Sequence, residues 1–455
     1  MCRKLLVLLL FILLIYQSAI SQSRNRRNTD SLNQNQDTLL TQKPPELSAE
    51  EISAYRLIDS VIRAEKLEEK FSKLELLINK NLTVGRFTLP LEKLINYNVH
   101  EGFRLGLGLM TNDKISKYFS VGGYIGFGFT DQAWKYGGDL ILNLREESES
   151  KIHFTYAHDV IEKAGYSFLE TPDLKSSEIF RKYMIEDMDL IEKYQVSFSF
   201  LSLQYLRTKI FYKQSHITAT DDYTFGSSLN ESTNKYIFDE IGIQFRYAYN
   251  EKFIRTLKTN YSLGTNFPVL YSNITIGTNW LDGEFEYTKY EAKVTKTFKI
   301  KTLGETRLAI VGGLIDNEVP VSKMYNGHGS YQPFSFEAEN SFGTMRMGEF
   351  YSDKFLSVFF KHDFGYFFKT KIFSPKFALV NNYGIATFSN KQNHFDTIEI
   401  KSYDKGFYEC GLLVNNILNT SYYGIGAAVF YRYGPYSLEK TADNFSYKLT
   451  VSIGL

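Results

Sequence analysis

The chain has 455 residues, with 52 basic and 51 acidic side chains, 16% aromatic residues and two cysteines. This charge balance argues against a nucleic-acid partner, which would favour a basic excess. The mean hydropathy is −0.26, and no apolar run after residue 21 reaches the ~20 residues of a membrane-spanning helix, which excludes a helical membrane protein.

The first 21 residues have the organisation of a secretory signal peptide. Arg3 and Lys4 precede an apolar stretch that is short for a membrane helix, and Ala19-Ile20-Ser21 forms a small-x-small cleavage site. A retained N-terminal membrane helix is the disfavoured alternative. Cleavage leaves 50 basic residues against 51 acidic ones and Cys410 as a single cysteine, so we expect no intrachain disulfide.

Residues 22–47 are rich in Asn, Gln, Ser, Thr and charge, and we interpret them as a disordered linker. A periplasmic helix is predicted at 48–80. Ser48 and Glu51 form a capping box, and apolar residues then recur at helical spacing. This helix either docks on the following domain or a periplasmic partner, or is a tether that packs on nothing specific.

From residue 82 onward the apolar period changes to two. The closing segment Phe445–Leu455 places Phe, Tyr, Leu, Val, Ile and Leu on one side, and mostly polar residues on the other. Its length matches the ~9–11 residues of an outer-membrane strand. A soluble sandwich also alternates, but here the polar face carries many glycines and regularly spaced arginines. We therefore predict an all-β domain at 82–455, a transmembrane antiparallel up-and-down β-barrel.

Fifteen strands are predicted after residue 100. They lie near 102–110, 118–129, 134–145, 151–160, 194–205, 207–219, 236–249, 268–279, 284–300, 305–316, 352–366, 376–388, 405–415, 422–433 and 443–455.

Four long gaps, at 161–193, 220–235, 317–351 and 389–404, each follow an even-numbered strand. Because outer-membrane barrels have long extracellular loops, one outward strand must precede the first, and 82–91 is the candidate. The total is then about 16 strands, with 14 as the alternative, and both mature termini are periplasmic. The first gap has an amphipathic centre that could act as a plug or lid, formed by Ile179, Phe180, Tyr183, Met184, Met188 and Ile191.

Several spaced segments then suggest a family. The residues at 98–105 (NVHEGFRL), 124–138 (YIGFGFTDQAWKYGG), 342–353 (FGTMRMGEFYSD) and 430–450 resemble motifs of an uncharacterised Gram-negative outer-membrane β-barrel family, usually headed by a carboxypeptidase-regulatory-like domain. The resemblance covers about 48–455 and implies the barrel and its location but no activity. We expect the head domain to be absent, because the linker is too short for a β-sandwich.

Candidate chemistry is sparse. No zinc motif or Cys/His cluster has metal spacing, and His153 and His158 should point to opposite faces, so neither metal nor cofactor is expected. Glu349, Asp353 and His362 form the best polar cluster for a hydrolase. A lumenal or loop network of charges without catalytic function is the favoured alternative. A lumenal charge ladder, serving either anion selectivity or interior rigidity, is predicted from Glu101, Arg104, Arg145, Arg246, Arg346 and Arg432.

The leading hypothesis is a non-enzymatic role in passage of material across the outer membrane or in envelope upkeep. The alternatives are a scaffold that offers helix 48–80 to a periplasmic protein, and an outer-membrane hydrolase. The expected partners are outer-membrane lipids, the barrel-assembly machinery during biogenesis and possible periplasmic proteins, with no nucleic acid.

Overall fold

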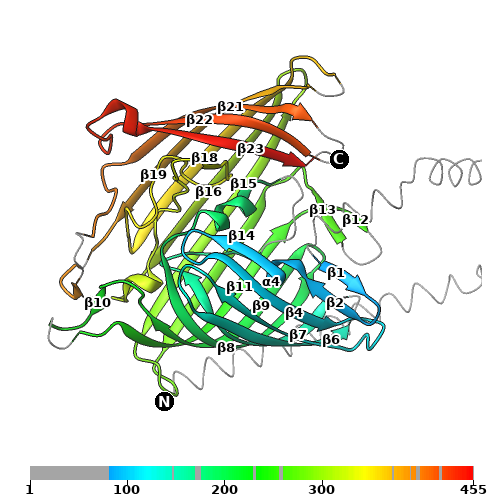
Figure 1. Ribbon diagram of the computed structural model, residues 1–455, viewed down its shortest axis with the longest axis vertical. Helices are drawn as coiled ribbons and strands as arrows, with labels where there is room; N and C mark the ends of the chain where they lie inside the picture. The colour runs from blue at the N-terminus through cyan, green and yellow to red at the C-terminus, as the bar shows by residue number, and fades with distance from the viewer. Residues whose placement is uncertain are drawn as a thin grey trace, which may run out of the picture. The chain divides into compact units, whose positions relative to one another are not determined.

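The computed structural model describes most residues from 81 onward (Figure 1). The described ranges are 81–145, 148–169, 176–228, 232–255, 260–370, 373–389, 391–395, 400–419 and 423–453. The predicted signal peptide at 1–21, linker at 22–47 and helix at 48–80 lie outside these ranges. The chain divides into two compact units, Met1–Leu77 and Ile78–Leu455, and all described residues belong to the second.

Long antiparallel strands form most of this unit, and each pairs with the next long strand along the chain. They are β4 (Gly102–Thr111), β5 (Phe119–Gly128), β6 (Trp134–Arg145), β7 (Ser150–Glu162), β8 (Met188–Leu203), β9 (Leu206–Thr218), β11 (Lys235–Ala248), β14 (Val269–Thr278), β15 (Tyr287–Ile300), β16 (Gly304–Ile315), β18 (Lys354–Tyr366), β19 (Lys376–Thr387), β21 (Phe407–Asn419), β22 (Tyr423–Tyr433) and β23 (Phe445–Ile453).

Short elements precede and connect these strands. They are β1 (Asn81–Val84), β2 (Phe87–Pro90), α4 (Leu91–Leu94), β3 (Ile95–Asn98), η1 (Glu178–Tyr183), β10 (Thr224–Phe225), β12 (Lys252–Arg255), β13 (Asn260–Gly264), η3 (Val321–Lys323), β17 (Ser335–Phe336), β20 (His394–Phe395) and η4 (Thr441–Asn444). Within the described residues, the large sheet has 19 strands.

The all-β prediction is confirmed, and a strand occupies each of the fifteen ranges predicted after residue 100. The predicted strand at 82–91 is wrong. Its residues form a hairpin, in which β1 pairs with β2 around the turn at Gly85. β2 and β3 then pair with opposite ends of β4, and α4 lies between them. The local pattern resembled one strand because a four-residue strand on each side of a tight turn also alternates.

The sheet has an unusual distribution of polarity. On β23, Ser446, Lys448 and Thr450 are buried, whereas Tyr447 is 61% exposed. On β4, Phe103 and Leu107 are 60% and 58% exposed. Apolar side chains therefore cover the exposed face, named here the outer face, and polar side chains are concentrated on the opposite, inner face. This is the arrangement that the period-two pattern predicted.

Two connections fold onto the inner face. One is residues 316–353, the inserted segment, and the other is residues 176–187, the η1 segment. β17 of the inserted segment adds to the edge of β23 in parallel, with Ser335 opposite Lys448 and Phe336 opposite Leu449. Figure 1 shows β23 beside β22 at the C-terminal end of the sheet. Among the described residues, β23 pairs in register with β22 and β17, and no such pairing joins it to β1, β2, β3 or β4.

Glycines on the inner face of β4 make room for α4. A Cβ atom at Gly106 would lie 2.7 Å from the carbonyl oxygen of Lys93, and one at Gly108 would lie 2.8 Å from the Lys93 Cβ. Lys93 itself places its Nζ 3.4 Å from the ring centre of Tyr124. The glycine alternation therefore reflects close approach of α4, in addition to the small side chains expected inside a barrel.

Replacement of Gly106 by alanine should disturb this contact, because the new methyl group would meet backbone oxygen atoms that cannot rotate away. We expect a loss of about 1–3 kcal/mol of unfolding free energy, measured by urea titration of the refolded protein. Gly126 is the matched control, because it is paired with Gly106 across β4 and β5 and the nearest contacts of its added Cβ would lie at an ordinary 3.4 Å. Equal losses for the two variants would contradict the explanation.

Candidate functional site

The base of the inserted segment is held by apolar packing. Tyr325, Phe342, Met345 and Phe350 are almost completely buried and belong to one hydrophobic cluster with strand residues. The ring of Phe342 packs against that of Phe407 of β21, with centroids 5.1 Å apart. The segment therefore contributes to the folded core and is not a loose surface loop.

Glu409 of β21 binds the backbone of the inserted segment. Its carboxylate accepts hydrogen bonds from the amides of Gly343 at 2.8 Å and Thr344 at 2.9 Å. It also accepts one from the Thr344 hydroxyl at 2.7 Å and one from the Asn382 amide at 2.7 Å. Glu409 is fully buried, so these four donors compensate for the cost of removing its charge from water.

Lys448 of β23 makes a second polar contact with the segment. Its Nζ donates to the carbonyl of Ser330 at 2.7 Å and to the hydroxyl of Ser335 at 2.9 Å. Ser335 also lies opposite Lys448 in the β17–β23 pairing. A strand side chain thus fixes the position at which the segment joins the sheet edge.

The tip of the segment, residues 330–341, carries carboxylates that contact cations of the strands. Lys361 of β18 lies 3.1 Å from Glu337 and 2.9 Å from Glu339. Arg307 of β16 lies 2.6 Å from Glu339 and 2.9 Å from Glu305. Burial alone raises the pKa of the Glu339 carboxyl, but Lys361 and Arg307 outweigh burial and hold that pKa well below its usual range.

The η1 segment joins the same network. Arg181 makes two hydrogen bonds to the Glu162 carboxylate, at 2.8 and 2.5 Å, and donates to the carbonyl of Gly329 at 2.9 Å. The Ser177 hydroxyl donates to Glu337 at 2.6 Å. These contacts fix the η1 segment to the inserted segment through charged and polar groups.

Glu178 links this segment to the sheet. Its carboxylate lies 3.2 Å from the Nζ of Lys293 on β15 and accepts a hydrogen bond from Asn340 at 2.9 Å. The ring of Phe180 also stacks on Phe336 of β17, with centroids 5.4 Å apart. The η1 segment therefore contacts both β15 and the strand that covers the edge of β23.

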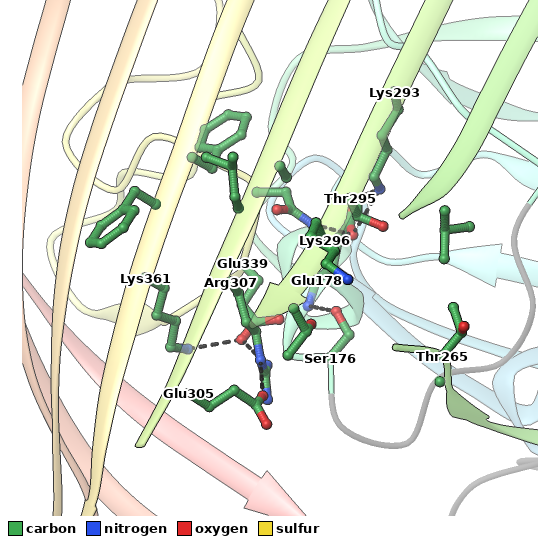
Figure 2. Close-up of a pocket in the computed structure, with 18 of the residues that line it drawn as sticks. Ser176, Glu178, Thr265, Lys293, Thr295, Lys296, Glu305, Arg307, Glu339 and Lys361 are labelled. Carbon is green, nitrogen blue, oxygen red and sulfur yellow. Dashed lines mark hydrogen bonds and ion pairs between the residues drawn. The ribbon is translucent and has the colours of Figure 1, made fainter. Parts of the chain in front are cut away.

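A cavity of about 390 Å³ lies beneath this network. Figure 2 shows Lys293, Arg307 and Lys361 reaching toward it from neighbouring strands, with Glu178 and Glu339 reaching in from the two segments. Thr265 and other residues of the connection between β11 and β14 close another side. The cavity is thus lined by residues of β14, β15, β16, β18 and β19 and of the connections folded beside them, and both polar and apolar groups contribute to its wall.

The predicted ladder charges fall into separate groups. Arg104 lies 3.2 Å from Glu101 and 2.6 Å from Asp159, all three on or next to strands near the N-terminal end of the sheet. Arg246 forms two hydrogen bonds with Glu251, at 2.7 and 2.6 Å, beside the cavity.

The remaining three ladder residues lie elsewhere. Arg432 lies 2.8 Å from Glu349 and 4.6 Å from the ring centre of Phe407. Arg346 is exposed in the inserted segment, and Arg145 is exposed at the end of β6. The structure therefore brings together neighbouring pairs of charges and does not align the six in one row.

The residues of the candidate hydrolase cluster have different partners. Glu349 meets Arg432, and Asp353 accepts a hydrogen bond from the Ser389 amide at 3.0 Å. His362 is bonded to the Thr306 hydroxyl at 2.7 Å. The side chain of His362 also alternates with that of Lys361 and so lies on the opposite face of β18 from the cavity. His153 lies 2.8 Å from Asp139, whereas His158 stacks on Tyr136.

The sequence interpretation missed the main polar contacts of the inserted segment. Lys361 and Lys448 occupy inner positions of correctly predicted strands, so the alternation contained a signal for their orientation. Glu337, Glu339 and the backbone amides that bind Glu409 belong to a connection without periodicity. The predicted plug at 161–193 contributes the η1 segment to the inner face, and residues 316–353 supply a larger insertion that was not predicted.

Two kinds of feature are absent from the described residues. No helix in these ranges has both the length and the apolar character needed to traverse a bilayer. Likewise, they contain no group of three or more His, Cys, Asp or Glu side chains placed to hold a metal ion.

The chain matches no family model and no curated protein sequence. Among solved structures, it is similar to BamA from Haemophilus ducreyi, at 10% identity over 79% of this chain and 69% of that chain, with a TM-score of 0.46. CdiB from Acinetobacter baumannii shares 12% identity over 77% and 56% of the two chains, with a TM-score of 0.42. Wzi of Escherichia coli, an outer-membrane carbohydrate-binding β-barrel involved in capsule assembly, shares 8% identity over 85% and 86%, with a TM-score of 0.36.

Replacement of Glu409 by glutamine should loosen the inserted segment, because the new NH2 group would face two hydrogen-bond donors at a position where a carboxylate oxygen now accepts from them. We expect a cost of about 1–3 kcal/mol for each buried donor left unpaired. Hydrogen exchange should show lost protection at the amides of Gly343 and Thr344. Glu439→Gln, at an exposed position, is the control. Unchanged protection in the Glu409 variant would contradict the assigned role.

Proposed function

We propose that the chain is an integral outer-membrane β-barrel that serves non-enzymatic passage of polar material, with the inserted segment closing its lumen in this conformation. The observation that carries the proposal is the reversed polarity of the sheet. Buried Lys448 and Glu409 lie on the inner face, while large apolar side chains such as Leu107 are exposed on the outer face.

An outer face of this kind is unfavourable in water, since each exposed apolar Å² costs about 25 cal/mol relative to burial. Lipid removes that cost, and hydrogen-bonded neighbouring strands satisfy the backbone groups that lipid cannot satisfy. Outer-membrane lipids are therefore the proposed surroundings of the outer face. Insertion by the barrel-assembly machinery follows from this location.

The contacts of the inserted segment on the inner face favour a movable gate over a permanent block of the lumen. The base of the inserted segment packs through apolar residues, but its tip at 330–341 is held mainly by groups that water or a polar solute can replace. Ion pairs in a polar interior gain little net stability over their hydrated state. Displacement of the tip therefore costs less than unfolding the base, and it would open the space beneath.

The proposed orientation places the long connections, including the inserted segment, on the extracellular side and both mature termini in the periplasm. The cavity then faces the periplasmic end, because the short connection between β15 and β16 lies next to it. A scaffold function of residues 48–80 concerns a part of the chain outside the described ranges. The separate partners of Glu349, Asp353 and His362 give the hydrolase alternative no support.

Leu107→Arg tests the membrane location. If Leu107 faces hydrocarbon near the bilayer centre, the substitution should destabilise the protein folded in vesicles, lowering its free energy of unfolding by about 2–4 kcal/mol. The measurement is urea-dependent folding into phosphatidylcholine vesicles, followed by the heat-modifiable gel shift. Leu107→Ala is the matched control for lost apolar contact. A Leu107→Arg variant as stable as the alanine variant would contradict burial in lipid.

The gate is tested by planar-bilayer conductance of refolded mature protein. Wild type should be mostly closed, and Glu337→Gln/Glu339→Gln should open more often because Lys361 and Arg307 lose charged partners. In a Cys410→Ser background, Phe336→Cys/Leu449→Cys should form a disulfide across β17 and β23 and abolish opening until a reductant is added. Their strand pairing places the Cα atoms at a separation that a disulfide accepts.

Two results would contradict the gate. One is steady wild-type conductance that the disulfide does not change, which would mean that the segment does not block the path. The other is silence of both the wild type and the glutamine variant in preparations shown to be folded, which would mean a permanently filled interior.

A further inference from the structure

The cations and most of the carboxylates around the cavity come from different parts of the fold. The cations Lys293, Arg307 and Lys361 come from three strands, β15, β16 and β18. Their main carboxylate partners, Glu178, Glu337 and Glu339, come from the two segments that fold over the strands. The strands thus supply these three cations and the carboxylate of Glu305, and the two segments supply the other carboxylates that pair with the cations.

We propose that this cavity binds a small solute with two or more acidic oxygen groups, phosphate or carboxylate, and that Glu337 and Glu339 occupy the positions of those groups when the solute is absent. The proposal rests on the proposed function, because it names the class of solute that releases the inserted segment. The inserted carboxylates are then internal competitors of the ligand.

The side chains suit oxyanions. The planar guanidinium of Arg307 presents several N–H donors to a carboxylate or phosphate, and Lys293 and Lys361 each supply a compact ammonium charge. Glu337 and Glu339 are two residues apart, and both contact Lys361. A ligand with two linked acidic groups would reproduce that arrangement.

Electrostatics also explains why binding of the anion should be coupled to withdrawal of the tip of the inserted segment. Withdrawal of the tip would leave Lys361 and Arg307 in a confined polar space with Glu305 as the remaining strand carboxylate nearby. A buried charge that loses its partner is costly, so an incoming anion stabilises the withdrawn state. A ligand that binds one state better than the other shifts the population toward it.

The cavity limits the size of the ligand. Its volume of about 390 Å³ is near the lower end of typical small-molecule sites. Tyr271 and Phe267 also line it and could contact a less polar part of the solute. A small metabolite-sized polyanion fits this space, whereas a folded protein or a long polymer does not.

Isothermal titration of refolded, full-length mature protein in detergent tests the site, with pyrophosphate and citrate as separate probes for phosphate and carboxylate. Wild type should bind at least one of them weakly. Glu337→Gln/Glu339→Gln should bind it about tenfold tighter or more, because the binding-competent state is no longer a minor population. Adding Lys361→Gln and Arg307→Gln to that variant should remove the gain.

Two further variants keep the test independent of misfolding. Glu349→Gln removes a carboxylate whose partner, Arg432, does not line the cavity. The affinity of this variant for the probe anion should therefore equal that of wild type. The Phe336→Cys/Leu449→Cys protein should bind more weakly when oxidised and recover when reduced. Every variant must retain the heat-modifiable gel shift.

The proposal is overturned if neither probe binds the folded Glu337→Gln/Glu339→Gln protein, or if that protein binds no tighter than wild type. It is also overturned if loss of Lys361 and Arg307 leaves affinity unchanged. These results are separate from the gate. If the glutamine variant opens but binds no anion, the gate is retained and the site is rejected. If anion binding requires Lys361 and Arg307 but no conductance is seen, the site is retained and the gate is rejected.

Discussion

The long strands of this sheet bury charged and polar side chains together on the inner face. This constraint shapes the rest of the molecule, because buried polar and charged groups need partners. Other strands supply some of them, as with Arg104 of β4 and Asp159 of β7. The inserted segment and the η1 segment supply others, as with Glu339 for Lys361 and the Gly343 amide for Glu409. The interior is therefore completed by connections rather than by the strands alone.

The same constraint explains why the interior has two regions. Near the long connections, Tyr325, Phe342 and Phe350 form an apolar cluster with strand residues. Toward the short connections, the tip of the inserted segment meets lysines and arginines above the cavity. Apolar packing gives the segment a fixed base, and exchangeable polar contacts hold its tip. A fixed base with a replaceable tip is the physical foundation of the proposed gate and of the proposed anion site.

The strands were predictable because apolar side chains alternate with polar or small ones over about ten residues in each. This length outweighs single residues that break the alternation. The first part of the sheet was not, because β1, β2 and β3 have four residues each and α4 interrupts them. The predicted ladder residues Arg104 and Arg246 were correctly identified as strand residues, but their partners Asp159 and Glu251 depend on pairing and turns. Glu337 and Glu339 carried no recognisable signal, since a connection that folds onto a sheet has no repeat to mark the contacting residues.

The pairing of β17 with β23 also has a consequence for the order of folding. Residues 335 and 336 precede their partner strand by more than a hundred positions, and β23 is the last described strand of the chain. The inserted segment therefore cannot reach its final position before the C-terminal strand is present, and neither Lys448 nor the free edge is available to it earlier. Completion of the inner face is thereby a late event in folding, dependent on the presence of β23.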